Sequence, residues 1–222
     1  MRLFIKTLQY RFKEMANTSV AAGQKAYMRN QFDYYGVKTP GRRQIQKELF
    51  KKELLPPKHE LSELVRTLWE LPEREHQYIA QELAKKYLRQ IEEDDIVLYE
   101  HMILHKSWWD TVDFIAATLV GAYFKSFPHT RDGITQKWLA SNNIWLQRSC
   151  LLFQLKYKET LDTVFLAKTI SSLLGSEEFF INKAIGWVLR EYSKTKPEWV
   201  LQFVADTSLN SLSKREALRL IP

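Results

Sequence analysis

The segment SWWDTVD at residues 107–113 gives the first indication of the fold. Trp109 and Asp113 lie four residues apart, about one helical turn, so a helix places the indole and the carboxylate on one face. Arg148 follows Asp113 after 35 residues, and a further step of 35 residues reaches Lys183. Equal steps between polar residues predict a helical repeat in which Asp113, Arg148 and Lys183 are neighbours.

The rest of the chain supports a repeat of paired helices. Tyr87, Tyr157 and Tyr192 keep the same register, because they are separated by 70 and then 35 residues. Apolar residues recur at three- and four-residue intervals, for example over 61–69 and 79–87. We therefore predict an all-α protein, an α-solenoid of HEAT-like helical-pair repeats that forms a single domain over residues 1–222. Its concave face suits an extended partner, either a nucleic-acid duplex or a peptide.

Some helix boundaries and one core helix can be predicted from residue types. Ser107 is a candidate N-cap for the helix that carries Trp109, and the segment 213–216 (SKRE) has the pattern of a capping box for a last helix. Residues 114–124 form an uncharged stretch of 11 residues. This stretch is too short to cross a bilayer, so we expect it to be a core helix.

The sequence contains no motif for a reactive thiol, a metal site, a nucleotide cofactor or a serine hydrolase. The single Cys150 lies in an apolar run and is expected to be a buried thiol in a reducing compartment. His101 and His105 have the spacing of a helical metal pair, but no third ligand accompanies them, so we predict no metal site. The chain has no GxGxxG, Walker or GxSxG motif. The N-terminal residues lack the apolar core of a signal peptide, and we expect no export.

The positive charge of the chain is unevenly distributed. The net charge is +7, and residues 1–55 carry 12 Lys and Arg against 4 Asp and Glu, which gives +8. Residues 56–110 carry 7 against 12, which gives −5. A basic N-terminal segment suits a polyanion that is bound along its backbone. A solvated basic surface without a partner would give the same count.

The residue types of Trp109, Asp113 and Arg148 indicate a chemistry. A tryptophan face attracts cations, and a partly desolvated carboxylate stabilises a developing positive charge. Arg148 would hold an anion nearby, so the three side chains suit a nucleotide with a cationic base and an anionic phosphate. Cleavage of a glycosidic bond passes through a cationic sugar, and a fixed carboxylate could lower that barrier and position a water. The alternative is structural: Trp109 is core, and Asp113 pairs with Arg148 between adjacent repeats.

Five segments of the chain resemble the AlkD-type DNA alkylation repair glycosylases, and the resemblance extends nearly from end to end. The segments are YMRNQF at 27–32, GVKTPGRR at 36–43, SWWDTVD at 107–113, IWLQR at 144–148 and KAIGWVLREY at 183–192. This resemblance implies a HEAT-like solenoid that cradles duplex DNA. It also implies excision of positively charged alkylpurines, such as 3-methyladenine and 7-methylguanine, without base flipping and with neither metal nor cofactor.

The resemblance assigns roles to individual residues. The family's catalytic positions correspond to Trp109, Asp113 and Arg148. Further positions are expected to contact DNA or complete the cleft; they are Tyr27, Thr39, Arg43, Lys156, Lys183, Trp187 and Arg190. A monomer in the cytoplasm, associated with the nucleoid when it is bound to DNA, follows from this identification.

Three functions remain in competition at the level of sequence. The first is an alkylpurine DNA N-glycosylase that acts in base excision repair. The second is a non-catalytic HEAT-like protein that binds DNA structure, and the third is a scaffold that binds proteins in the same groove. Retention of Trp109, Asp113 and Arg148 favours the first function.

Overall fold

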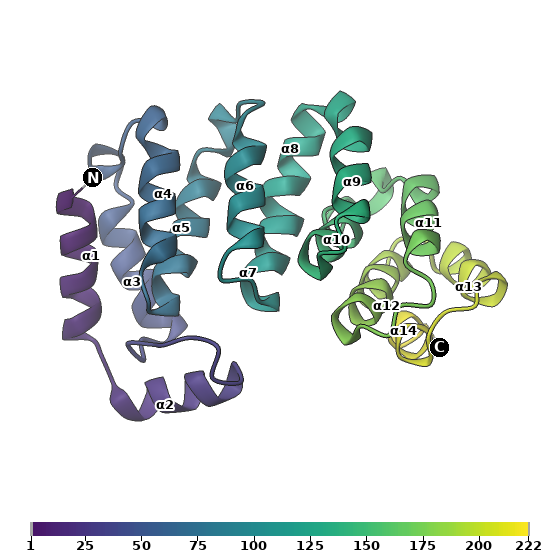
Figure 1. The fold of residues 1–222 in the computed structure, drawn as a ribbon, viewed down its shortest axis with the longest axis horizontal. Helices are drawn as coiled ribbons and strands as arrows, with labels where there is room; N and C mark the ends of the chain where they lie inside the picture. Colours follow the sequence, from purple (N-terminus) through teal and green to yellow (C-terminus); the bar gives the residue numbers. More distant parts are fainter. Residues whose placement is uncertain (1, 222) are drawn as a thin grey trace. The chain divides into compact units, whose positions relative to one another are not determined.

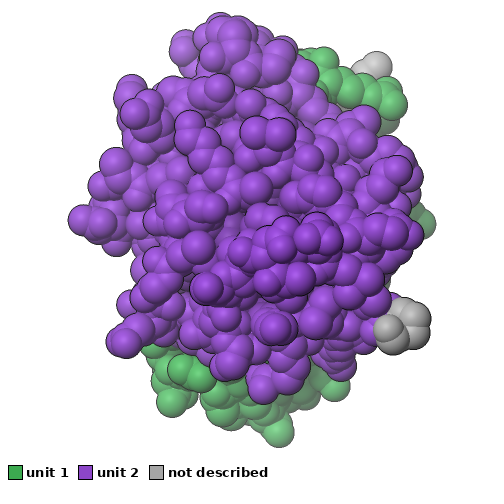
Figure 2. All heavy atoms as spheres, turned by 90° about the vertical axis from the view of Figure 1, so that its right-hand side faces the viewer, with its two compact units in different colours: residues 1–91 green, residues 92–222 purple. Residues whose placement is uncertain are grey.

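The computed structural model describes residues 2–221, with all their side chains except that of Lys52. The chain divides into two compact units, an N-terminal unit that ends at Ile91 and a C-terminal unit that begins at Glu92 (Figure 2). Regular structure in the described residues is helical, with one isolated parallel bridge between Asp33 and Glu73. The prediction of an all-α protein is confirmed, and the stacked helices are consistent with an α-solenoid.

The described part of the N-terminal unit, residues 2–91, contains five α-helices. In Figure 1, α1, α3, α4 and α5 stand side by side and α2 lies across their ends. The helices are α1 (Arg2–Glu14), α2 (Thr18–Tyr27), α3 (Thr39–Leu49), α4 (Leu61–Glu70) and α5 (Arg74–Lys86).

The C-terminal unit continues the pairing of helices. Contacts join α10 to α12 and, most extensively, α12 to α14 (Figure 1). The helices are α6 (Asp95–Leu104), α7 (Trp109–Phe114), α8 (Gly121–Ser126), α9 (Arg131–Ala140), α10 (Ile144–Leu152), α11 (Thr163–Ser172), α12 (Phe179–Ser193), α13 (Pro197–Asp206) and α14 (Ser211–Ala217). A π-helical segment, Ile115–Val120, joins α7 to α8.

The apolar periodicity of the sequence corresponds to the buried faces of the helices. In α4, Leu64, Val65 and Leu68 are fully buried, and Ile79 and Leu83 of α5 are buried opposite them. Each helix therefore presents one apolar stripe to its partner, and burial of such side chains stabilises the fold by about 1.5–3 kcal/mol per residue.

Tyrosines connect successive helical pairs through backbone carbonyls. The Tyr87 hydroxyl donates to the carbonyl oxygen of Pro56, and the Tyr157 hydroxyl donates to that of Gly121 at 2.6 Å. A Cβ on Gly121 would lie 2.5 Å from the carbonyl oxygen of Phe153, so only glycine allows the two segments to approach this closely. Tyr87 and Tyr157, which share a register in the sequence, thus both donate to a backbone carbonyl of an earlier segment, although the two acceptors are not at equivalent positions.

Both predicted helix caps are wrong. Ser107 lies before the helix and donates to the carbonyl oxygen of Ile103, while Trp108 occupies the N-cap position in extended backbone. The last helix begins at Ser211 behind the N-cap Asn210, so Ser213 lies inside it. The Glu of the supposed capping box, Glu216, is engaged elsewhere in the structure.

The uncharged stretch 114–124 is a core helix, as predicted. Ile115, Ala116, Leu119 and Val120 are fully buried. No helix within residues 2–221 combines the length and the apolar character that a membrane span requires.

Candidate active site

Asp113 and Arg148 form a bidentate ion pair in the C-terminal unit. Arg148 Nε lies 2.7 Å from Asp113 Oδ1, and Arg148 Nη2 lies 2.9 Å from Asp113 Oδ2. The third donor group, Nη1, donates to the carbonyl oxygen of Phe180. The predicted contact between residues 35 apart is confirmed. The guanidinium of Arg148, on α10, is held both by the carboxylate on α7 and by a backbone carbonyl of α12.

The pair is largely withdrawn from solvent. The side chain of Arg148 is 4% exposed and that of Asp113 is 13% exposed. Burial raises the pKa of Asp113 above that of an ordinary aspartate, because desolvation penalises the charged form, while the hydrogen bonds from Arg148 oppose this rise. The carboxylate retains lone pairs that Arg148 does not use, so it can still accept a hydrogen bond from a water.

Trp109 begins α7, one turn before Asp113, and its side chain is partly buried. The N-cap residue Trp108 has extended backbone angles, with φ −157° and ψ 159°, so the helical conformation begins at Trp109. The i, i+4 relation places Trp109 and Asp113 on the same face of α7, as the sequence predicts.

An aromatic cluster packs beside the ion pair. Trp108, Trp145 and Phe180 make three mutual ring contacts, with centroid distances of 5.7, 5.2 and 5.0 Å. The Arg148 guanidinium carbon lies 6.0 Å from the centroid of the Phe180 ring. Phe180 thus connects the aromatic cluster to Arg148, and apolar surroundings strengthen the electrostatic interactions of a buried ion pair.

The π-helical segment begins two residues after Asp113, at Ile115. Such segments insert extra backbone into a helix and are frequent at functional sites. Thr118, inside this segment, accepts a hydrogen bond from Lys156 Nζ at 2.7 Å. Lys156 is exposed, so the lysine that the resemblance assigns to DNA binding is held against the helix that carries Asp113.

Three further predicted residues belong to α12. Trp187 is partly buried and packs against the C-terminal core. Lys183, the next step of the predicted series after Asp113 and Arg148, forms an ion pair with Glu216 at 2.8 Å. Arg190 contacts the same carboxylate at 2.6 Å.

The remaining predicted residues, Tyr27, Thr39 and Arg43, lie in the N-terminal unit. Tyr27 ends α2 and is 73% exposed, and both Thr39 and Arg43 are exposed in the first turns of α3. Lys38, the N-cap of α3, makes no side-chain capping bond. Backbone N–H groups at this helix end are therefore oriented to meet an anion.

The loop before α3 is fixed by a buried carboxylate. Glu75 of α5 accepts hydrogen bonds from the backbone N–H groups of Tyr35, Gly36 and Val37, at 3.2, 3.0 and 3.0 Å. Gly36 has φ +85°, and a Cβ there would lie 2.0 Å from the carbonyl oxygen of Asn17. Glycine is required at this position, and Glu75 sets the entry of the chain into α3.

A basic groove lies between α3 and α5. It has a volume of about 500 Å³ and is lined by five cationic side chains and one carboxylate. The charged lining residues are Arg43, Lys47, Lys51, Lys85, Lys86 and Glu82. A surface with this charge excess attracts a polyanion.

Two expectations about reactive side chains can be compared with the structure. Cys150 is buried, as predicted, and burial raises the pKa of its thiol. The rings of His101 and His105 stack at 4.0 Å. Within residues 2–221, no three His, Cys, Asp or Glu side chains are grouped so that they could hold a metal ion.

Sequence reasoning did not identify the aromatic cluster or the Phe180 carbonyl. Phe180 lies 35 residues after Trp145, so the spacing that identified Arg148 also contained a signal for it. Glu216 was assigned to a cap and was therefore missed as an ion partner.

Comparison with known proteins agrees with this architecture. The family model described as DNA alkylation repair enzyme matches residues 8–221. A solved structure, titled a predicted DNA alkylation repair enzyme from Enterococcus faecalis, is similar with a TM-score of 0.86 and 33% sequence identity. The similarity covers 93% of this chain and 97% of that one. The search of curated proteins gave no match. Since the family model spans nearly the whole chain, the protein belongs to the DNA alkylation repair enzyme family.

Proposed function

We propose that the protein is an AlkD-type DNA glycosylase that hydrolyses the N-glycosidic bond of positively charged alkylpurines in duplex DNA. The bidentate pair of Arg148 and Asp113, one helical turn from Trp109, is the observation that supports this function most directly. Substrates of this class include 3-methyladenine and 7-methylguanine.

The proposed reaction assigns one task to each side chain. The bond from the sugar C1′ to the purine breaks, and its electrons neutralise the cationic base, which leaves as a neutral alkylpurine. Asp113 stabilises the positive charge that develops on the sugar and orients a water, whose oxygen forms the new bond to C1′. The proton released from that water passes to solvent. Arg148 holds Asp113 ionised, and the face of Trp109 attracts the cationic nucleotide.

Two basic surfaces support duplex DNA as the partner. The groove between α3 and α5 and the open N-terminus of α3 suit phosphates in the N-terminal unit. In the C-terminal unit, the exposed Lys156 adds a cation, and its ammonium group donates to Thr118 in the segment that joins α7 to α8.

Base release from methylated duplex DNA by the purified protein tests this function. Asp113→Asn keeps the shape and removes the charge, so the release rate should fall about 100-fold or more while duplex affinity is unchanged or slightly higher. Asp132→Asn is the matched control, because it makes the same change in net charge at a side chain that is 78% exposed. Release at the parent rate by Asp113→Asn would assign the trio a structural role. Duplex binding without release by the parent would favour the non-catalytic alternative.

A further inference from the structure

Glu216 lies beneath two cations of the proposed DNA-binding face. Its side chain is 9% exposed, and each of its oxygens accepts from one cation: Oε1 from Lys183 at 2.8 Å and Oε2 from Arg190 at 2.6 Å. These contacts lower the pKa of Glu216, with the hydrogen bond from Lys183 as the largest cause. The carboxylate is therefore charged at neutral pH, and two cations from one helix converge on it.

The two cations flank Trp187 on α12. Lys183, Trp187 and Arg190 are spaced as i, i+4 and i+7, which places them on one face of the helix. Lys183 has three N–H donors and Arg190 has five, and each uses one of them on Glu216. Both side chains keep donors for a further anion beside the tryptophan.

The position of Glu216 is fixed by the close packing of α14 on α12. A Cβ on Gly186 would lie 2.5 Å from Cβ of Glu216 and 2.9 Å from the carbonyl oxygen of Ser213, so α14 approaches as closely as glycine permits. Ser213 Oγ donates to the carbonyl oxygen of Asn182 at 2.8 Å, and both residues are buried. The backbone and Cβ of Glu216 are therefore held at a fixed place beside α12.

We propose that Glu216 is a positioning residue, which holds Lys183 and Arg190 on either side of Trp187 so that their remaining N–H groups bind a DNA phosphate. This inference rests on the proposed function and makes α14 a part of the binding site. The Glu216 carboxylate offsets one of the two positive charges. The two cations therefore attract a phosphate less strongly, but their positions are fixed. Fixed donors act only on a phosphate in one place, which orients the adjacent nucleotide for cleavage.

The substitution Glu216→Gln separates the effect of Glu216 on the attraction for phosphate from its effect on the position of the two cations. It removes the negative charge and frees the two cations, so duplex affinity at low salt should rise. The slope of log K against log salt should also become steeper, by about 0.9 for one further neutralised phosphate. The release rate at saturating enzyme should fall about tenfold, because two long side chains must then be ordered on each binding event. A residue that only supports the fold would not increase affinity and reduce rate together.

The control and second variants make the test decisive. Glu198→Gln makes the same charge change on an exposed residue of α13 and should leave both the slope and the rate at parent values. If Glu216→Gln does not fold, Glu216→Asp keeps the charge but is too short to reach both cations. It should lower the rate without raising affinity. Combining Glu216→Gln with Lys183→Met should remove most of the change in slope, because the two residues act together.

The outcomes also distinguish this inference from the proposed function. Identical slopes and rates for Glu216→Gln and Glu198→Gln would overturn the inference, as would a parent chain that does not bind duplex DNA. A parent that binds duplex DNA but releases no base would overturn the glycosylase function alone. In that case the difference in salt slope between the two variants still decides the role of Glu216.

Discussion

Asp113 is subject to two opposing influences. Burial favours its neutral form, and the two hydrogen bonds from Arg148 favour its charged form. The spacing of 35 residues predicted that the two side chains meet, because equivalent positions of a helical repeat are neighbours. The degree of burial could not be predicted, since it depends on tertiary packing around the pair, which includes the rings of Trp108 before α7, Trp145 of α10 and Phe180 of α12.

The protonation of Asp113 should determine the acid limb of the pH–rate profile. The proposed reaction needs the carboxylate, so kcat/KM for release of 7-methylguanine should fall as the pH drops through the pKa of Asp113 in the free protein. Because burial raises this pKa, the limb should lie above the ordinary value for an aspartate. Release is measured from acid to neutral pH, with the reaction in buffer alone subtracted. If the rate of the Asp113→Asn variant falls at the same acid pH as that of the parent, a group other than Asp113 titrates.

At the scale of elements, the sequence predicted helices more reliably than their ends. The apolar stripes of α4 and α5 follow directly from residue spacing. The caps at Ser107 and Ser213 were wrong, because a cap requires a side-chain oxygen to meet a specific backbone N–H, and several polar residues near a helix start can satisfy the same pattern. Glu75 could not be found from sequence either, since its three N–H donors lie 38 to 40 residues away.

Glu75 should be one of the most sensitive positions of the N-terminal unit. Glu75→Ala leaves the N–H groups of Tyr35, Gly36 and Val37 without their acceptor in a buried loop. Such groups cost about 1–3 kcal/mol each, so the free energy of unfolding should fall by about 3 kcal/mol or more. Chemical denaturation measures this, with Glu63→Ala on the exposed face of α4 as the control. Equal midpoints for the two variants would contradict the anchoring role.

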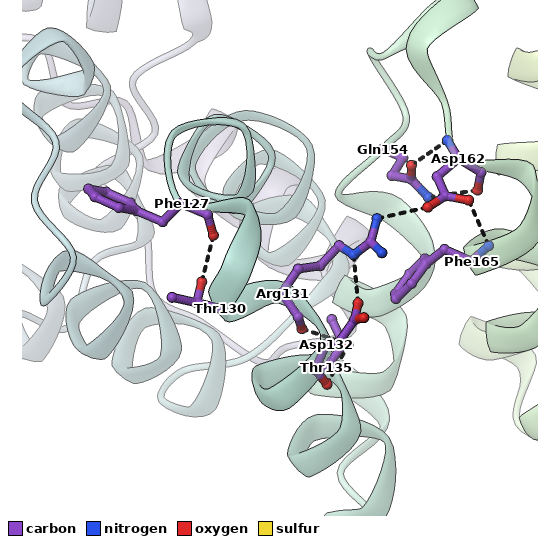
Figure 3. Close-up of polar contacts among 8 residues, drawn as sticks. All are labelled: Phe127, Thr130, Arg131, Asp132, Thr135, Gln154, Asp162 and Phe165. Atoms are coloured by element: carbon purple, nitrogen blue, oxygen red, sulfur yellow. Dashed lines mark hydrogen bonds and ion pairs between the residues drawn. The ribbon is translucent and has the colours of Figure 1, made fainter.

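Asp162 tests the link between α9 and α11 (Figure 3). It caps α11 by accepting from Phe165 N at 2.9 Å and also accepts from Arg131 Nη1 at 2.9 Å. Gln154 forms two further hydrogen bonds with the backbone of Asp162. The backbone N–H of Phe165 is the largest cause of the lowered pKa of Asp162. A lowered pKa in the folded state stabilises the protein above the unfolded pKa, and this stabilisation disappears as the pH falls through the folded value.

Two substitutions at Asp162 should differ in consequence. Asp162→Ala loses the cap and should lower the free energy of unfolding by about 1–2 kcal/mol. Asp162→Asn keeps a capping oxygen and loses only a solvent-screened ion pair, so it should cost about 0.5 kcal/mol or less. Thermal unfolding at neutral and acid pH measures both. The difference between Asp162→Asn and the parent should vanish in acid, and a difference that persists there would exclude the charge as its cause.

At the scale of the whole molecule, the sequence located an excess of positive charge but not its arrangement. The +8 of residues 1–55 includes Arg43, Lys47 and Lys51, which line one groove. The same groove receives Lys85 and Lys86 from the segment whose net charge is −5. Segment totals could not show this, because the groove combines the ends of two helices that are far apart in sequence.

Salt dependence of duplex binding should show whether this groove contacts the phosphate backbone. Each phosphate that a cation neutralises releases counterions and contributes about 0.9 to the slope of log K against log salt. Lys47→Gln combined with Lys51→Gln should therefore reduce the magnitude of the slope by about 1–2 and weaken binding alike for methylated and unmodified duplexes. Lys6→Gln combined with Lys13→Gln, which removes the same charge from exposed residues of α1, should leave the slope near that of the parent. If both pairs change the slope equally, net charge and not the groove determines affinity. If the parent itself shows no dependence on salt, the backbone of DNA is not the partner of this surface.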